Sequence, residues 1–311
     1  MEGAGILIVT HNSEAEIGAC LEAALATGAE VLVVDNASED GSVAAARRCG
    51  ANIIANKENR GFAAAVNQGI RAIGADRILL LNPDAVLRTG IEALCAACGS
   101  PEVGAVGGKL VDSGGAVQAG FNVRRLPTPA ALAFEILLIN RLWPGNPVNW
   151  HYRCYDIDLD KPAKVEQPAG AFLMFRRDVW DRLGGFDEQF YPIWFEDVDF
   201  CKRLRDQGYY SYYEPAAIAT HEGGHSIRKI LLEKREFYWY GSLLKYCFKH
   251  FNSGRTQLLC LAVIVGSLLR MIVGIVVQGS FKPIGIHGGA ILLASRYLLF
   301  GPRKMGVSSF T

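Results

Sequence analysis

Residues 31–36 read VLVVDN, an apolar run that ends in an aspartate and an asparagine. Similar apolar runs occur at residues 5–9 (GILIV), 52–55 (NIIA) and 77–82 (RILLLN). The stretches 13–25 and 61–73, which lie between these runs, have the apolar spacing of helices. Because short apolar strands that alternate with helices build βαβ units with right-handed crossovers, the sequence predicts a doubly wound α/β sheet.

Polar residues follow three of these apolar runs. Thr10, His11 and Asn12 follow the first run, Asp35 and Asn36 the second, and Asn82 and Asp84 the fourth. In doubly wound sheets, ligands bind beyond the carboxyl ends of the strands. Each of these residues could instead cap a helix or shape a turn. Three such endings at one edge of a sheet favour a ligand site.

The composition narrows the class of protein. The chain has 311 residues, half of them hydrophobic, which suits one elaborated domain or one domain plus an appendage. Its 32 basic residues nearly balance its 31 acidic residues, so no net field attracts it to nucleic acid. Its eight cysteines show no repeating framework, which is typical of reduced thiols. The start MEGAGILIVT is interpreted as a first strand rather than a signal peptide, so we expect a cytoplasmic location.

The carboxyl-terminal part differs in composition. Residues 258–277 are apolar over a length that could cross a bilayer, with Arg270 as their one charge, and residues 288–300 form a second apolar segment. Basic residues flank both segments, which suits anionic lipid headgroups. Because an arginine at the bilayer centre is costly, Arg270 favours a hairpin with a polar lining or helices that lie at the interface. A soluble bundle is also consistent with this pattern.

Residues 194–201 read WFEDVDFC and hold three carboxylates: Glu196, Asp197 and Asp199. Three interpretations are open. The acids could favour the positive end of a helix, bind a cation, or accept a proton from a substrate. Asp199 lies on a different helix face from Asp197, and we predict an ordinary helical ion pair between Asp199 and Arg203 or Lys202.

Five motifs occur in a fixed order along the chain: VVDNASEDGS, NRGFAAAVNQG, LLLNPDA, GGFDEQFYPIWFEDVDFCKRLRDQG and HEGGHS. Together they resemble glycosyltransferase family 2, and within it the bacterial rhamnosyltransferase branch, over about residues 4–250. The resemblance implies a GT-A fold, in which a Rossmann-like, mostly parallel central sheet is flanked by helices. It also implies a nucleotide-sugar donor, a divalent metal (Mg²⁺ or Mn²⁺) and inversion at the anomeric carbon.

The predicted organisation is therefore a catalytic domain over residues 1–250 and an apolar, helical, membrane-associating region over residues 251–311. Residues 120–168 contain six prolines and lose regular periodicity, so we expect an irregular insertion there that shapes the acceptor site. The protein is expected at the cytoplasmic face of the cell membrane, either peripheral or integral.

The donor pocket is predicted at the strand ends. The carboxylate of Asp35 could accept the imide N–H of uracil or thymine, although an aspartate that only makes a turn is the rival interpretation. The family pattern places Thr10 and Asn12 in the same base and ribose pocket. Asn59 and Arg60 precede a predicted helix and could hold the diphosphate, although Arg60 could also be a surface charge.

The resemblance places the metal site at NPDA and HEGGHS. Asp84 and His221 would bind the metal, while Asn82 replaces the first carboxylate of the family's DxD motif. Diphosphate oxygens and waters could complete the coordination of a hard cation. His225 matches a less constrained position, and a zinc site formed by His221 and His225 is disfavoured by the glycines between them.

The resemblance makes Asp197 the base that removes a proton from the acceptor hydroxyl. Glu196, Asp199 and the flanking aromatic rings could raise the pKa of Asp197 by repulsion and desolvation, and Glu196 could instead orient the acceptor. Trp194, Glu196 and Asn67 complete the predicted substrate-binding set.

The leading hypothesis is transfer of L-rhamnose from dTDP-L-rhamnose to a glycan or a polyprenyl-diphosphate-linked saccharide, in cell-surface polysaccharide synthesis. One alternative is transfer of galactofuranose or N-acetylglucosamine from UDP, because Asp35 cannot distinguish uracil from thymine. A nucleotidyltransferase is disfavoured because its glycine-rich signature is absent near residues 5–14. A non-catalytic, membrane-bound sensor of nucleotide sugars is the remaining alternative.

Overall fold

The computed structural model describes residues 3–223 and 230–301, which fall into two compact units. Of the described residues, 3–126, 151–192 and 196–223 belong to the first unit, and 127–150, 193–195 and 230–301 belong to the second. This division differs from the predicted boundary at residue 250. Residues 127–150 and 230–250 join the carboxyl-terminal helices because their own helices pack against them.

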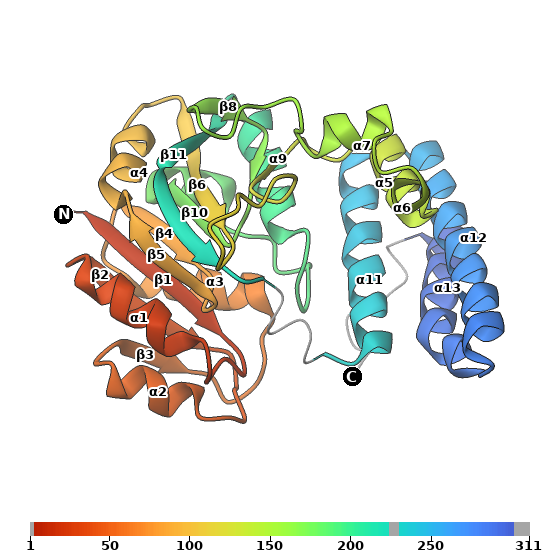
Figure 1. Cartoon of the computed structure of the whole chain (residues 1–311), viewed down its shortest axis with the longest axis horizontal. Coiled ribbons are helices and arrows are strands. Elements are labelled where there is room, and N and C mark those ends of the chain that lie inside the picture. The colour runs from red at the N-terminus through yellow and green to blue at the C-terminus, as the bar shows by residue number, and fades with distance from the viewer. Residues whose placement is uncertain (1–2, 224–229, 302–311) are drawn as a thin grey trace. The chain divides into compact units, whose positions relative to one another are not determined.

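The first unit is built on a sheet of nine strands, counted over the residues that the structure describes, in the order β3-β2-β1-β4-β10-β6-β11-β5, with β8 paired to β11 (Figure 1). Strands β1 to β4 pair in parallel, as the predicted βαβ series requires. Strand β10 runs antiparallel between β4 and β6, and β11 is parallel to β6 but antiparallel to β5. The second half of the sheet is therefore mixed.

The elements of the first unit have the following bounds. The strands of the main sheet are β1 (Ala4–Thr10), β2 (Glu30–Asp35), β3 (Asn52–Ala55), β4 (Arg77–Leu81), β5 (Ala85–Thr89), β6 (Val103–Val111), β8 (Ala163–Val165), β10 (Phe172–Arg176) and β11 (Tyr210–His221). A separate two-stranded ribbon consists of β7 (Val123–Arg124) and β9 (Gln167–Pro168). The helices are α1 (Ile17–Ala26), α2 (Ser42–Arg48), α3 (Phe62–Ala72), α4 (Ile91–Cys98), α8 (Arg177–Leu183) and α9 (Glu196–Asp206).

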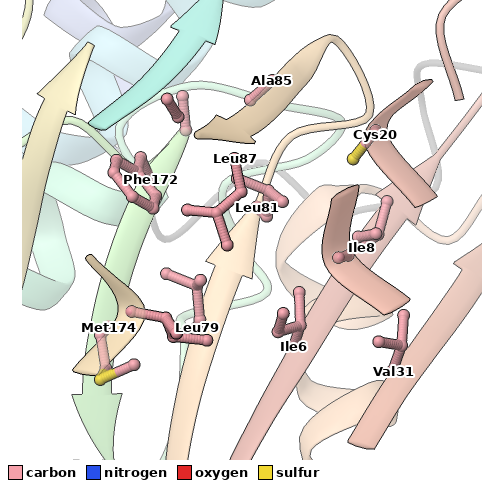
Figure 2. Close-up of a cluster of buried hydrophobic side chains, with 14 of the residues drawn as sticks. Ile6, Ile8, Cys20, Val31, Leu79, Leu81, Ala85, Leu87, Phe172 and Met174 are labelled. Carbon is pink, nitrogen blue, oxygen red and sulfur yellow. The ribbon is translucent and has the colours of Figure 1, made fainter. Parts of the chain in front are cut away.

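Both faces of the central strands are buried. In β1, Ile6 and Ile8 join one core with side chains of α1, α2 and α4, and Figure 2 shows part of this cluster around Leu79 and Met174. Leu7 and Val9 point to the other face, where α3, α8 and α9 contribute the core. Because side chains alternate along a strand, only a continuous apolar run can fill both cores, which explains the runs that predicted the fold.

The second unit is helical. It contains α5 (Pro129–Ile136), α6 (Ile139–Leu142), the start of α7 (Pro147–Tyr152), α11 (Leu232–His250), α12 (Ser253–Gln278) and α13 (Lys282–Phe300). By length and composition alone, α12 and α13 are each long and apolar enough to cross a membrane. The proline-rich stretch that was predicted to be irregular thus holds three short helices besides β7, β8 and β9.

Asn67 of α3 holds the loop that leads towards α9. Its Nδ2 donates to the carbonyl of Phe186 (2.8 Å) and to Glu188 Oε1 (2.9 Å), and its Oδ1 accepts from the N–H of Phe186 (2.9 Å) and from Trp180 Nε1 (3.3 Å). The side chain is 2% exposed. The structure thus gives this predicted substrate-binding residue four hydrogen bonds to three other residues.

Substitution Asn67→Ala should lower the free energy of unfolding of the full chain by about 2–4 kcal/mol, because it leaves buried backbone and indole groups without partners. Urea unfolding followed by circular dichroism measures this loss. Asn52→Ala, which removes an exposed asparagine, is the matched control and should change stability by less than about 0.5 kcal/mol. Equal losses in the two variants would contradict the structural role of Asn67.

Candidate active site

Thr10 and Asp35 end two neighbouring strands and are partners in the parallel register of β1 and β2. They are 1% and 2% exposed. Asp35 Oδ1 accepts from Ser38 Oγ (2.5 Å) and Oδ2 accepts from the Ser38 N–H (3.0 Å). The hydroxyl of Thr10 has no hydrogen-bond partner among the described residues. Asp35 makes a turn, as the rival interpretation expected, yet each of its oxygens keeps a further lone pair for a ligand N–H.

Asn12 fixes the loop that follows β2. Its N–H donates to Ser38 Oγ (2.8 Å), and its Oδ1 accepts from the N–H of Glu39 (2.8 Å). Its φ of 55° lies in the left-handed region, which asparagine tolerates better than most residues. Ser38 therefore joins Asn12 to Asp35, and the sequence analysis missed it. The spacing Asp-x-x-Ser, which is typical of a side-chain-capped turn, was the available signal.

Asn36 connects the end of β2 to the start of α3. Its Nδ2 donates to Asn59 Oδ1 (2.9 Å), and its Oδ1 accepts from the backbone N–H of Arg60 (3.0 Å). Asn59 Oδ1 also accepts from the N–H of Gly61 (2.9 Å). The guanidinium of Arg60 is exposed and has no hydrogen bond or ion pair within the described ranges. Asn59 thus shapes the turn, and the cation of Arg60 remains available to a ligand.

Asp84 and His221 lie side by side at the other end of the site. Residue 221 ends β11 and pairs in register with Ala85 at the start of β5, and His221 Nε2 lies 3.5 Å from Asp84 Oδ1. His221 Nδ1 faces Gln118 Oε1 at 3.2 Å, and Gln118 Nε2 donates to the carbonyl of His221. Because a partner at one ring nitrogen orients the other, Gln118 directs Nε2 towards Asp84.

This pair fits the implied divalent metal. A carboxylate oxygen and an imidazole nitrogen are ligands that Mn²⁺ accepts, and at 3.5 Å the two atoms are close enough to share one ion. No group of three or more His, Cys, Asp or Glu side chains with a metal-binding arrangement occurs among residues 3–223 and 230–301. The protein would therefore supply few ligands, and donor oxygens would have to complete the shell. His225 lies outside the described residues.

Asp197, in the first turn of α9, is held by three N–H donors. Its Oδ1 accepts from the N–H of Val198 (2.8 Å), and its Oδ2 accepts from the N–H of Gly170 (3.1 Å) and from Gln167 Nε2 (3.4 Å). A side chain at position 170 would bring its Cβ within 2.9 Å of Asp197 Oδ2, so the close approach requires glycine. The orientation of the carboxylate is fixed before any substrate binds.

The two acids of the ED pair have different environments. Burial raises the pKa of Asp197, while the N–H groups of Val198 and Gly170 and the charge of Arg124 oppose that rise. Burial, reinforced by the negative charge of Asp197, raises the pKa of Glu196 well above its usual range. Glu196 is 5% exposed, and its Oε2 has no hydrogen-bond partner in the described part of the chain. Burial thus disfavours the ionised form of both acids, while the N–H donors and the charge of Arg124 offset part of that effect at Asp197.

Asp199, the third acid of the stretch, is fully buried and pairs with Arg203, whose Nε lies 2.7 Å from Asp199 Oδ2. The guanidinium also donates to the carbonyls of Leu183 (2.7 Å) and Gly185 (2.8 Å). The predicted ion pair is confirmed, with Arg203 rather than Lys202 as the partner. Lys202 instead contacts Asp206.

A short backbone segment joins Asp197 to the strand-end residues. The N–H of Gly170 donates to Asp197, and the carbonyl of Ala171 accepts from the N–H of Asn82 (3.0 Å). Asn82 and Asp197 therefore flank the same dipeptide, although 115 positions separate them in the sequence (197 − 82). The segment that follows β4 and the first turn of α9 are thus linked through residues 170 and 171.

A second series of contacts, along the β7–β9 ribbon, links Asp197 to His221. Its register places Arg124 opposite Gln167, which donates to Asp197. The guanidinium carbon of Arg124 lies 5.8 Å from the centroid of the Phe121 ring, and that ring stacks on His221 with centroids 5.4 Å apart. The sequence analysis missed Gln118, Phe121, Arg124 and Gln167, because their stretch lacks periodicity and only the fold brings them to the site.

Trp194 is placed differently from the other predicted site residues. The segment 193–195 belongs to the helical unit, where the carbonyl of Ile193 accepts from Ser242 Oγ (3.0 Å) and Phe195 packs near Tyr246 (5.5 Å between ring centroids). Trp194 and Phe195 have φ values of 78° and 68°, a left-handed conformation that is costly for bulky residues. The strained segment directly precedes the ED pair.

Comparison with known proteins identifies the class. The sequence profile of the family described as Glycosyl transferase family 2 matches residues 5–184, more than half of the chain. The chain belongs to this family and is a glycosyltransferase of its rhamnosyltransferase-like branch.

Two characterised relatives are similar to this chain. It is 32% identical over 211 residues to an N-acetylglucosaminyl-diphospho-decaprenol L-rhamnosyltransferase of Mycobacterium tuberculosis, an alignment that covers 63% of this chain and 67% of that protein. It is 33% identical over 86 residues to the rhamnosyltransferase WbbL of Escherichia coli, covering 28% of this chain and 30% of that protein.

Solved structures establish the fold. A mannosyltransferase from Pyrobaculum calidifontis in complex with GDP-Man and Mn²⁺ superposes with a TM-score of 0.53 at 16% identity, covering 96% of this chain and 87% of that one. GalNAc-T7 with UDP, GalNAc and Mn²⁺ has a TM-score of 0.52 at 12% identity, covering 80% of this chain and 50% of that one. The predicted GT-A fold is confirmed.

The raised pKa of Glu196 predicts a pH-dependent stability. The unfolded carboxyl has a pKa of about 4.3, so the folded state binds more protons above that pH. The stabilisation is complete below about pH 4.3 and is lost as the pH rises through the folded pKa of Glu196. Substitution Glu196→Gln, which cannot ionise, should therefore stabilise the protein relative to wild type increasingly from pH 4 to pH 8. Urea unfolding across this range measures the difference, and a constant difference would contradict a buried, protonated Glu196.

Proposed function

We propose that the chain is an inverting transferase that moves L-rhamnose from dTDP-L-rhamnose to a polyprenyl-diphosphate-linked saccharide at the cytoplasmic face of the membrane. The observation that carries the proposal is the convergence of Asp197 and Asn82 on the Gly170–Ala171 dipeptide. This convergence supports the proposal that Asp197 acts as the base beside the strand ends that would hold the donor. The similarity to the mycobacterial decaprenol-linked enzyme supports the acceptor class and the sugar.

In the proposed reaction, Asp197 takes the proton of an acceptor hydroxyl while that oxygen attacks the anomeric carbon. The bond between this carbon and the diphosphate oxygen breaks, and the nucleoside diphosphate leaves with the electron pair. A single displacement inverts the anomeric configuration. Because the N–H donors of Val198 and Gly170 and the amide of Gln167 hold both carboxylate oxygens, the base keeps one orientation throughout the attack.

The remaining site residues would bind the donor. The carboxylate of Asp35 and the partnerless hydroxyl of Thr10 offer an acceptor and a donor to a pyrimidine base. Arg60 and the start of α3 offer positive charge to the diphosphate, although the N–H of Phe62 is already donated to the carbonyl of Pro192 (2.8 Å). Asp84 and His221 would hold the Mg²⁺ or Mn²⁺, which neutralises charge on the leaving group.

Glu196 is proposed to orient the acceptor. A protonated carboxyl has one hydrogen to donate and keeps its other oxygen as an acceptor, so it could bind a sugar hydroxyl from both sides. Its raised pKa and its unpartnered Oε2 support this role. A Glu196 that stays protonated would also leave Asp197 as the one anion beside the attacking oxygen.

A second donor class remains compatible with the site. Uracil and thymine carry the same imide N–H, so Asp35 would accept UDP-sugars such as UDP-galactofuranose or UDP-N-acetylglucosamine as well as a dTDP-sugar. A non-catalytic sensor is the third candidate, because Asn82 lacks the charge of the usual first carboxylate. The fixed base disfavours a sensor, since binding alone does not require it.

A panel of nucleotide sugars tests the donor and the base together. With dTDP-L-rhamnose and a short-chain polyprenyl-diphosphate N-acetylglucosamine acceptor, mass spectrometry should detect the addition of one deoxyhexose, with Mg²⁺ or Mn²⁺ present. Asp197→Asn should lower kcat by about 10²–10⁴-fold while the donor Kd changes little, because the base acts only in the transition state.

Asp206→Asn, an exposed change on the same helix α9, is the matched control and should keep wild-type turnover. Product formation from UDP-sugars but not from dTDP-L-rhamnose would refute the donor. Wild-type turnover by the Asp197→Asn variant would refute the mechanism.

A further inference from the structure

Helix α12 presents a continuous apolar face. Between Leu258 and Val277 its exposed side chains are all leucine, isoleucine or valine, and Val276 and Val277 are each 77% exposed. This face extends about 28 Å at 1.5 Å per residue. Exposed apolar surface of this extent is unusual on a soluble monomer and marks a binding surface. Figure 1 shows α12 beside α13, which exposes Leu292, Leu299 and Phe300.

The charge of this pair of helices has one sign. Helices α12 and α13 contain Arg255, Arg270, Lys282 and Arg296 and no aspartate or glutamate. Arg255, Lys282 and Arg296 are exposed. An apolar face whose own two helices carry only cations complements an anionic lipid surface, whereas a second copy of the same face would bring like charges together.

Arg270 is the charge that a membrane would be expected to exclude, and it faces the protein. Its Nη2 donates to the carbonyl of Glu135 at the end of α5 (3.5 Å). At Gly266, one turn earlier, an added Cβ would lie 2.5 Å from the carbonyl oxygen of Ile136, so the two helices are in close contact there. The apolar face therefore continues past Arg270 without interruption.

The neighbouring helix α11 argues against a hairpin that crosses the bilayer. It lies along α13 from end to end: Glu236 Oε2 is 3.7 Å from His287 Nδ1, and the rings of Phe248 and Tyr297 stack at 5.1 Å. Charged residues occupy positions 233–236 and recur at Lys245, so the longest uncharged run of α11 is residues 237–244. These eight residues would extend about 12 Å, far short of the hydrocarbon core of about 30 Å. Crossing would carry the charges of α11 into hydrocarbon.

We propose that α12 and α13 lie in the plane of one leaflet of an anionic bilayer, with the apolar face of α12 in the acyl boundary and α11 on the aqueous side. The arrangement is monotopic, so the turn between α12 and α13 stays on the side of the membrane that holds the catalytic unit. This inference rests on the membrane part of the proposed function, and it would keep the enzyme on the leaflet where a lipid-linked acceptor is found.

Binding to lipid vesicles tests whether the apolar face of α12 contacts the membrane. The full-length double variant Leu261→Asp with Leu268→Asp should cosediment at least tenfold less than wild type with vesicles of phosphatidylglycerol and phosphatidylcholine. Gln257→Asp with Gln278→Asp adds the same charge to exposed polar positions of α12 and should lower binding less than threefold. Equal binding by both double variants would overturn the proposal. The proposal would also be overturned if the wild-type chain were a dimer and the two leucine substitutions made it a monomer. A second copy of the chain would then cover the apolar face.

Labelling of the turn tests the topology. Ser280→Cys in the full chain is treated with a membrane-impermeant maleimide in inverted membrane vesicles and in intact spheroplasts, with the wild-type chain as the background for its own cysteines. The monotopic arrangement predicts labelling in inverted vesicles and protection in spheroplasts. The reverse pattern would overturn it in favour of a hairpin that crosses the bilayer. Sugar transfer by the wild-type chain to a short, soluble acceptor is measured in parallel, and it does not depend on either topology. Absence of this transfer would therefore count against the proposed function alone.

Discussion

The contact between the carboxylate of Asp197 and the backbone N–H of Gly170 is the constraint on which the site depends. Asp197 begins a helix, whereas Gly170 precedes a strand of the central sheet, so this hydrogen bond fixes the acid helix to the sheet. Because glycine is required at the contact, the approach is a property of the backbone. The neighbouring Ala171 carbonyl then accepts from the N–H of Asn82, which sets the position of Asp197 relative to the end of β4.

The polar residues at the strand ends have mostly structural partners. Asp35 and Asn12 meet at Ser38, Asn36 meets Asn59, and Asn67 is fully engaged in the core. Such side chains position backbone and neighbouring groups, and the atoms left without partners mark where a ligand would bind. Within the described part of the first unit, such atoms include the hydroxyl of Thr10, the guanidinium of Arg60 and Glu196 Oε2. Side chains that their own partners already hold in place reduce the ordering cost of binding.

The sequence was most informative where the structure is local or periodic. The parallel half of the sheet followed from apolar runs, since strands buried on both faces leave that signal. The ion pair of Asp199 and Arg203 followed from helical spacing. Gln118, Phe121 and Arg124 were not predicted, because nothing in their aperiodic stretch indicates that it folds back onto His221. The membership of α11 in the helical unit was also missed, because it depends on packing against α13, a contact between segments far apart in the chain.

Asp84, His221 and Asp197 are proposed to form one active centre that acts on a single bound nucleotide sugar. The most direct measurement is a crystal structure of the full chain grown with dTDP and Mn²⁺, with anomalous differences collected at the manganese edge. The account predicts one manganese peak bonded to Asp84 and His221 Nε2, a pyrimidine on Asp35, and the Asp197 carboxylate facing the open side of the diphosphate. A manganese peak away from Asp84 and His221, or an Asp197 carboxylate turned from the bound nucleotide, would contradict it.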